Sequence, residues 1–434
     1  MQNRLENLII YRVDKDSLIM QIAEAVNYSE NIDKQRSKCY AAVKELLDFA
    51  TKYGWNHNLW QCLLTYHLLY DENSYTLSKE RITDEFNGSI HQFLRHDMQL
   101  FYELFHYDFS EVEKSLKVDC FRIITDYRAI EKREEIVDDL TGTKIIEINQ
   151  KLANAENGDE MLKIIDDFYG QYGCGKFAFH KAFRIHEGKH GLEIIPITNM
   201  AKITFHDLIG YESQKEELAK NTEAFLAGYQ ANNVLLYGES GTGKSTSIKA
   251  IANQYYEKGL RLIEIHKHQF YLLNELMQVL KSRNYGFIIY MDDLSFEENE
   301  IEYKYLKAVI EGGLEMKPKH VLIYATSNRR HLIRETWRDR NDVNENQDIH
   351  ISETMSEKLS LVARFGISIY YGKPSNQEYQ MIVAELAKAA HLTGYSEQEL
   401  WQAATAWELR HGGVSGRCAR QLIDHLKATP KNSL

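Results

Sequence analysis

A stretch rich in glycine, lysine and hydroxyl side chains follows an apolar run near the middle of the chain. It reads LLYGESGTGKSTSIKA over residues 235–250. Glycines let the backbone turn so that successive N–H groups point at one anion. Lys244 adds a cation, the hydroxyl of Ser245 suits Mg²⁺, and a helix beginning near Lys244 directs the positive end of its dipole to the same place. The spacing G-x-x-x-x-G-K-[ST], between a predicted strand and a predicted helix, therefore predicts a phosphate-binding loop.

The residues of this loop form the first candidate site. Those expected around the phosphates are Gly238, Glu239, Ser240, Gly241, Thr242, Gly243, Lys244, Ser245 and Thr246. A second glycine-rich stretch, around Gly173 and Gly175, is followed by Lys176 and Phe177, which is the wrong spacing for the same chemistry. We interpret that stretch as a turn before a strand.

Two carboxylates, Asp292 and Asp293, close an apolar strand in FIIYMDDLSFE. Asp292, at the end of a strand expected beside the phosphate loop, is placed to hold Mg²⁺ through water. Asp293 is the candidate to polarise the attacking water. Another apolar strand runs into Asn328, whose amide can orient that water beside a γ-phosphate.

From about residue 200 onward, apolar strands alternate with helices, which is typical of a parallel sheet with helices on both faces. In such sheets, functional groups collect at the carboxyl ends of the strands. The strands predicted here are Asn233–Tyr237, Leu260–Ile265, Phe287–Asp292, Val321–Thr326 and Ile367–Tyr371.

The first 170 residues have the apolar spacing of three and four that is typical of helices, as in SKCYAAVKELLDFATKY and HNLWQCLLTYHLLY. The aromatic stretch RHDMQLFYELFHYDF, residues 95–109, is interpreted as a buried helix and not as a cofactor site. After it, KFAFHKAFRI and GLEIIPI, joined by HEGKH, alternate like a β-hairpin.

Charge and cysteine content narrow the classes of function. The formal net charge of the 434 residues is −11, with −9 in residues 1–200 and −2 in residues 201–434, so neither part has the basic excess of a nonspecific nucleic-acid binder. The five cysteines contain no C-x-x-C pair, which argues against a zinc site or a disulfide framework and predicts reduced, mostly buried thiols. No run of about 18 apolar residues exists and charges interrupt the first residues, so we expect a cytoplasmic protein.

Residues 200–428 resemble the AAA+ P-loop ATPases, and in detail a bacterial family catalogued as domain of unknown function 815. The matching stretches are DLIGYESQKEELAKNTEAFLAG, NNVLLYGESGTGKST, MDDLSFE, LKAVIEGG, VLIYATSNRRHL, EKLSLVARFG and SGRCARQLI. The resemblance implies an α/β core with a five-stranded parallel sheet, and a small helical lid over the nucleotide. The expected divisions are a helical domain at 1–170, a β-hairpin connector at 171–200, the nucleotide-binding subdomain at 201–373 and the lid at 374–434.

The resemblance also implies roles for single residues. It places Ile209, Gly210 and Tyr211 around the adenine and assigns the first sensor to Asn328, an arginine finger to Arg364 and the second sensor to Arg417. It implies a ring or open spiral, of six subunits by resemblance, formed or tightened by ATP. The alternative for Arg364 is a structural ion pair within its own subunit.

One departure concerns the second acid. Most AAA+ proteins have Asp-Glu where this chain has Asp292-Asp293, a pair that resembles bacterial replication initiators and helicase loaders. Aspartate is shorter by one methylene group, so hydrolysis could be slow, and Glu297 is a weaker candidate for the base.

Three functions remain open from the sequence. The first is a Mg²⁺-dependent ATPase that couples nucleotide state to remodelling or regulation of a protein partner bound by the helical region. The second is a nucleic-acid remodeller or helicase loader, suggested by the Asp-Asp pair and by the arginines of NRRHLIRETWRDR. The third is a nucleotide-binding scaffold with little turnover. Turnover distinguishes the third from the others, and salt-dependent duplex binding distinguishes the second.

Overall fold

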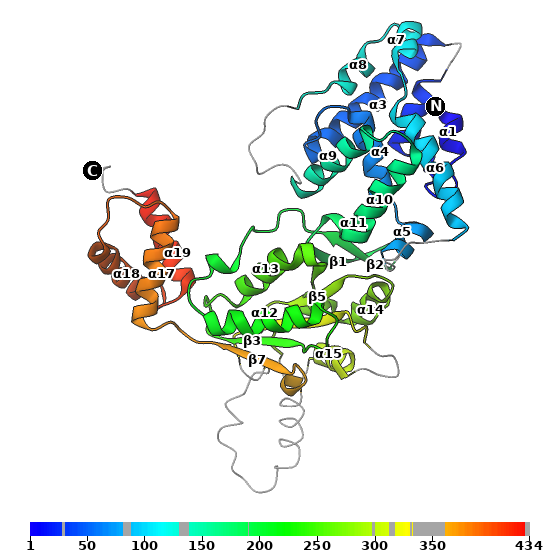
Figure 1. Cartoon of the computed structure of the whole chain (residues 1–434). Helices are drawn as coiled ribbons and strands as arrows, with labels where there is room; N and C mark the ends of the chain where they lie inside the picture. Colours follow the sequence, from blue (N-terminus) through cyan, green and yellow to red (C-terminus); the bar gives the residue numbers. More distant parts are fainter. Residues whose placement is uncertain are drawn as a thin grey trace. The chain divides into compact units, whose positions relative to one another are not determined.

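The computed structural model divides into two compact units, Met1–His180 and Lys181–Leu434 (Figure 1). It describes residues 1–27, 31–80, 88–129, 139–189, 191–296, 300–311, 317–329, 332 and 361–429. The boundary between the units falls inside the segment 171–200. Among the described residues, no helix is both long and apolar enough to cross a bilayer.

The first unit is helical, which confirms the prediction for this part of the chain. Its helices are α1 (Gln2–Glu6), α2 (Leu18–Ala25), α3 (Ile32–Tyr53), α4 (Leu59–Tyr70), α5 (Ser74–Lys79), α6 (Ile90–Phe105), α7 (Ser110–Leu116), α8 (Cys120–Thr125), α9 (Asp139–Ala153), α10 (Gly158–Tyr172) and α11 (Gly175–Phe179). The two stretches with the clearest helical spacing became α3 and α4. All five cysteines of the chain are buried free thiols, as predicted.

Helix α6 buries one apolar stripe in the core of this unit, as the aromatic stretch predicted. Leu94, Met98, Phe101 and Leu104 follow the spacing of three and four and are fully buried. The same stripe contains Asp97, which is also 0% exposed. A buried carboxylate requires hydrogen-bond donors, and here they come from the backbone near the start of the chain.

Asp97 accepts hydrogen bonds from three successive backbone N–H groups. Its Oδ1 lies 2.9 Å from the nitrogen of Ile9, and its Oδ2 lies 2.7 Å from that of Ile10 and 3.0 Å from that of Tyr11. The segment that these N–H groups belong to links α1 and α2, so one side chain on α6 fixes it. Hydrogen bonds to a charged group are stronger than those between neutral groups.

We expect Asp97→Asn to lower the free energy of unfolding by about 1–3 kcal/mol, because the new amide nitrogen would face backbone donors. Urea unfolding followed by circular dichroism measures the change. Asp48→Asn is the control, since Asp48 forms an exposed ion pair with Lys44 on α3. Equal stability of the two variants would contradict this role of Asp97.

The second unit is built on a seven-stranded sheet in the order β2-β1-β4-β5-β6-β3-β7. The strands are β1 (Ala182–Gly188), β2 (Gly191–Pro196), β3 (Val234–Gly238), β4 (Leu260–Glu264), β5 (Gly286–Met291), β6 (Val321–Ser327) and β7 (Ile367–Tyr371). The strands β3 to β7 are mutually parallel and match the five predicted strands to within one residue at each end.

The predicted β-hairpin belongs to the sheet and is more than a connector. Its first strand, β1, pairs in parallel with β4, and β2 pairs with β1 in antiparallel orientation. The strand begins at Ala182 and not at Lys176, because Gly175–Phe179 forms helix α11. The sheet therefore has seven strands where five were expected.

The sheet order also corrects the expected neighbour of the phosphate-loop strand. Strand β3 lies between β6 and β7, so β5, which leads to Asp292, is one strand further away. The carboxyl end of β6 separates the acids from the phosphate loop. Any direct contact between the acids and the phosphate loop must therefore pass over the last residues of β6.

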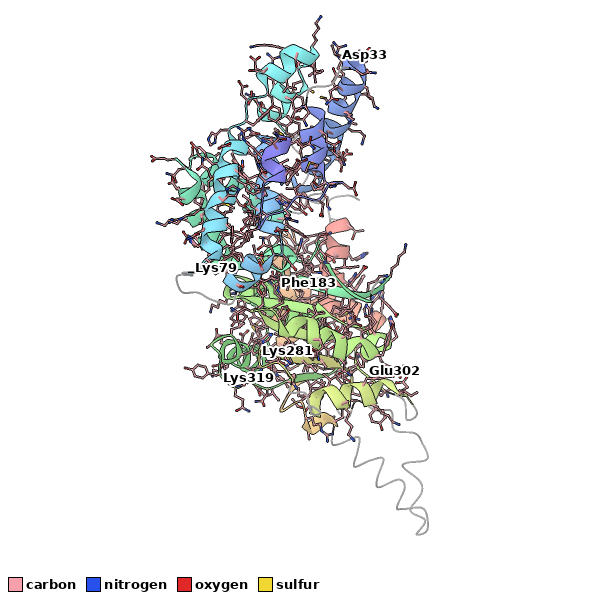
Figure 2. The ribbon with its side chains drawn as sticks, turned by 90° about the vertical axis from the view of Figure 1, so that its right-hand side faces the viewer. Asp33, Lys79, Phe183, Lys281, Glu302 and Lys319 are labelled. Atoms are coloured by element: carbon pink, nitrogen blue, oxygen red, sulfur yellow. The ribbon has the colours of Figure 1, made fainter. Side chains whose placement is uncertain are left out.

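Helices cover the sheet and form a separate lid. The helices of this unit are α12 (Glu212–Leu226), α13 (Lys244–Tyr255), α14 (Leu273–Lys281), α15 (Glu302–Glu311), α17 (Asn376–Ala389), α18 (Glu397–His411) and α19 (Gly416–Ala428), with short 3-10 helices η1 (Phe205–Asp207), η2 (Tyr256–Lys258) and η3 (Lys267–Leu272). Apolar side chains of α12 and α13 share one core with the sheet, and α17, α18 and α19 have a core of their own. Figure 2 shows the side chains from a second direction, with Lys281 of α14 and Glu302 of α15 labelled.

Candidate nucleotide-binding site

The predicted phosphate loop connects β3 to α13. Gly238 has a φ of 134°, and a Cβ atom there would lie 2.1 Å from the carbonyl oxygen of Tyr371. Gly243, directly before α13, has a φ of 98°, and a Cβ atom there would lie 2.3 Å from a methyl carbon of Leu208. Both positions require glycine for their conformation and for their surroundings. The loop thus has the tight turns that its sequence predicted.

A cavity of about 520 Å³ opens around this loop. Its lining comprises Asp207, Leu208, Ile209, Tyr211, Ser240, Gly241, Thr242, Gly243, Lys244, Ser245, Thr246, Asp292, Asp293, Thr326, Asn328, Ile382, Leu386, Gly416, Arg417 and Arg420. Most of the sequence-predicted site residues are among them. Gly210, Gly238, Glu239 and Arg364 are not in the lining.

Lys244 is buried at the base of the cavity. Its ammonium group donates hydrogen bonds to the carbonyl oxygens of Gly238 and Glu239 at 2.8 and 2.6 Å, and to Asn328 Oδ1 at 3.0 Å. Burial lowers the pKa of Lys244, and the nearby carboxylate of Asp293 acts in the opposite direction. The cation is therefore held within the loop, at the place where phosphate oxygens would meet it.

Ser245, in the first turn of α13, and Asp292, after β5, meet although β3 and β5 are not neighbouring strands. The hydroxyl of Ser245 donates to Asp292 Oδ1 at 2.7 Å, and the hydroxyl of Thr326 donates to the same oxygen at 2.6 Å. Burial acts to raise the pKa of Asp292, but these hydrogen bonds hold it below its ordinary value. The carboxylate is therefore ionised at neutral pH.

The residues around Asp292 fit a hydrated magnesium ion. Ser245 gives its hydroxyl hydrogen to Asp292, which leaves its oxygen lone pairs for a cation. The hydroxyl of Tyr290, a residue that is 1% exposed, also lies near Asp292, Ser245 and Thr326. Magnesium prefers oxygen ligands and keeps several of its waters, so the hydroxyl oxygen of Ser245 beside the ionised carboxylate of Asp292 suits it.

Asp293 and Asn328 form the next layer of the cavity. The side-chain amide of Asn328 donates to Asp293 Oδ1 at 2.8 Å, while its oxygen accepts from Lys244. Asp293 has a φ of 49°, an uncommon conformation that aspartate tolerates better than most residues. Asn328 thus links Asp293, the candidate base, to the ammonium group of Lys244. Glu297, the weaker candidate, lies outside the described residues.

The lid reaches the phosphate loop through the first turn of α19. The backbone N–H of Arg417 donates to the carbonyl oxygen of Gly241 at 3.3 Å, and Ser415 caps the helix by accepting from the N–H of Cys418. Arg417 and Arg420 both line the cavity. Residues three apart lie on one face of a helix, so α19 presents two guanidinium groups to the same space.

Part of the cavity lining is apolar. Ile382 and Leu386 of α17 line it, and Ile209 packs against the core of the lid. The ring of Tyr211 stacks on Tyr371 with centroids 5.2 Å apart, and its hydroxyl donates to the carbonyl oxygen of Gly372. Apolar walls of this kind suit a flat base.

Arg364 lies near the amino ends of the parallel strands, whereas its own phosphate loop lies at their carboxyl ends. It precedes β7 by three residues, whereas the loop follows the end of β3, and these two strands run in parallel. A five-residue strand is about 16 Å long, which is further than an arginine side chain reaches. The fold therefore separates Arg364 from the cavity of its own chain.

A match to the family described as "Protein of unknown function (DUF815)" covers residues 168–430, more than half of the chain. The chain belongs to this family. Its second unit has the glycine-rich loop, the parallel core sheet and the helical lid that the resemblance to AAA+ proteins predicted.

Other similarities are more distant. The chain is 25% identical over 192 residues to the 26S proteasome regulatory subunit 4 homolog B of Arabidopsis thaliana, a match that covers 38% of this chain and 43% of that protein. Among solved structures, the Holliday junction branch migration motor RuvB of Thermotoga maritima has 17% identity and a TM-score of 0.35, over 52% of this chain and 64% of the RuvB chain. The chain therefore spans less than two thirds of the length of either relative.

Several residues that line the cavity around the phosphate loop were not predicted from the sequence. These are Asp207, Leu208, Thr326, Ile382, Leu386, Gly416 and Arg420. A signal existed for Arg420, which follows Arg417 by one helical turn, and for Thr326, which lies near the end of a predicted strand. The apolar residues of α17 resemble any helix core and gave no signal. Of the arginine-rich segment 328–340, only Asn328, Arg329 and Leu332 are among the described residues.

Proposed function

We propose that this chain binds ATP together with Mg²⁺ and hydrolyses it, and that the nucleotide state controls a protein partner. The observation that carries the proposal is the convergence of Lys244, Ser245, Asp292, Asp293 and Asn328 in one cavity. Phosphoryl transfer to water requires three kinds of group. These are a cation for the phosphates, oxygen ligands for a metal, and a carboxylate that can act on the attacking water.

Each residue has a separate role in this proposal. The loop backbone and Lys244 bind the β- and γ-phosphates, and Ser245 and Asp292 hold Mg²⁺, which neutralises charge on those phosphates when bound. Asp293 accepts a proton from the attacking water, which Asn328 orients through its amide. Arg417 stabilises charge on the phosphates from the lid. Ile209, Gly210 and Tyr211 flank the base.

Assembly and coupling form the second part of the proposal. Since Arg364 lies far from its own phosphate loop, we assign it to the cavity of a neighbouring subunit in a ring or open spiral of six. The first unit has its own hydrophobic core, so it can present a binding surface to a partner that is independent of the nucleotide site. A short Asp293 in place of the usual glutamate supports slow turnover.

We expect Lys244→Ala to weaken ATP binding by about 100-fold or more, because the variant loses the charged donor to two phosphates. Fluorescence titration with a labelled ATP analogue measures the dissociation constant. Lys220→Ala is the matched control, since Lys220 is an exposed lysine on α12 of the same unit. Unchanged affinity in Lys244→Ala would contradict the phosphate loop, and tight binding by the wild type without any turnover would favour the scaffold function.

A further inference from the structure

The hydroxyl of Thr326 contacts both acidic residues at once. It accepts a hydrogen bond from the backbone N–H of Asp293 at 2.9 Å and donates one to Asp292 Oδ1 at 2.6 Å. Thr326 is 2% exposed, so water competes little for these bonds. One hydroxyl therefore uses its single hydrogen and a lone pair to fix the side chain of one acid and the main chain of the other.

The sheet order explains why a residue of β6 has this position. The last pair between β5 and β6 is Met291 with Ala325, which brings Asp292 next to Thr326. On its other side, Thr326 pairs with Leu236, two residues before Gly238. Thr326 therefore lies between the acids and the phosphate loop, where the contact from Ser245 to Asp292 passes over β6.

The backbone of the same residue adds a third contact. The carbonyl oxygen of Thr326 accepts from the N–H of Leu294 at 2.7 Å. The next hydroxyl, that of Ser327, donates to the carbonyl oxygen of Leu294 at 2.8 Å. The turn that carries both acids is thus held to the end of β6 by main chain and side chain together, which restricts the positions that the carboxylates can take.

We propose that Thr326 is a positioning residue that sets Asp292 for Mg²⁺ and Asp293 for the attacking water. This inference rests on the proposed ATPase function. Without the hydroxyl, Asp292 Oδ1 would lose one of its donors, and the backbone N–H of Asp293 would lose its hydrogen bond to Thr326. Asp292 would then be free to turn away from the position of the metal, and the positive φ of Asp293 would lose one of its supports.

The test compares Thr326→Val, which keeps the branched shape and removes the hydroxyl, with Thr326→Ser, which keeps the hydroxyl. The first readout is the dissociation constant of a labelled ATP analogue, measured with Mg²⁺ and with EDTA. We expect Thr326→Val to lose about 10-fold or more of the gain in affinity that Mg²⁺ gives the wild type, and to bind like the wild type in EDTA. The second readout is kcat, which we expect to fall about 10–100-fold in Thr326→Val and to be largely restored in Thr326→Ser.

Thr222→Val is the matched control for stability. Thr222 is also fully buried, and its hydroxyl bonds the carbonyl oxygen of Leu218 and the hydroxyl of Tyr324, away from the cavity. We expect it to lower the melting temperature without changing kcat or the gain from Mg²⁺. If Thr326→Val keeps the kcat of the wild type and its gain in affinity from Mg²⁺, the positioning role is wrong. It is also wrong if Thr222→Val and Thr326→Ser lose as much of both as Thr326→Val does. A wild type whose ATP affinity does not respond to Mg²⁺ would instead contradict the proposed function itself.

Discussion

Asp293→Asn should still bind ATP and should hydrolyse it about 10²–10⁴-fold more slowly. The amide has the shape of the carboxylate, and its oxygen can still accept the hydrogen bond that Asn328 donates at 2.8 Å. It cannot accept a proton from water. Phosphate release under saturating ATP and Mg²⁺ measures the rate, and titration with a labelled analogue measures the affinity.

The comparison variant for this prediction is Glu297→Gln, which removes the other candidate acid. Normal hydrolysis in Asp293→Asn together with none in Glu297→Gln would move the base to Glu297. Loss of both binding and hydrolysis in Asp293→Asn would show that Asp293 serves the structure of the site more than the chemistry. A retained affinity with a reduced kcat is the result expected for a base.

Arg364→Ala should lower the rate of ATP hydrolysis by about 10³–10⁵-fold, the range for arginine fingers in general. The guanidinium is expected to neutralise charge on the γ-phosphate of a neighbouring subunit, since Arg364 precedes β7, a strand about 16 Å long, whereas its own phosphate loop follows the end of the parallel strand β3. Mixing separates this role from a structural one. Lys244→Ala protein and Arg364→Ala protein, each inactive alone, should recover partial activity when combined.

The recovery has a simple origin. In a randomly mixed ring of head-to-tail subunits, about a quarter of the interfaces pair an intact Lys244 with an intact Arg364. The double variant Lys244→Ala/Arg364→Ala, mixed with either single variant, is the control and should give no recovery. Absence of recovery together with a monomer by light scattering in ATP would exclude both the finger and the ring. A large drop in melting temperature for Arg364→Ala would then favour an ion pair within the subunit.

The sequence by itself determined the phosphate loop and the five parallel core strands. The loop is a local structure: Gly238 to Ser245 are consecutive, and their glycines, lysine and hydroxyl act through neighbouring backbone atoms. The strands β3, β5 and β6 are mostly apolar runs, because a parallel strand inside the sheet is buried on both faces. Both features depend on residues close together in the chain, so a pattern in the sequence is enough to predict them.

The tertiary structure alone decided which strands are neighbours and which side chains meet. The hairpin joins the sheet, β6 separates β3 from β5, and Thr326 therefore lies between the acids and the phosphate loop. Asp97 finds its donors 86 to 88 residues away along the chain, and Arg420 meets the cavity only because α19 docks on Gly241. Such contacts arise from packing between distant segments, whose free energy depends on the whole fold and not on local residue spacing.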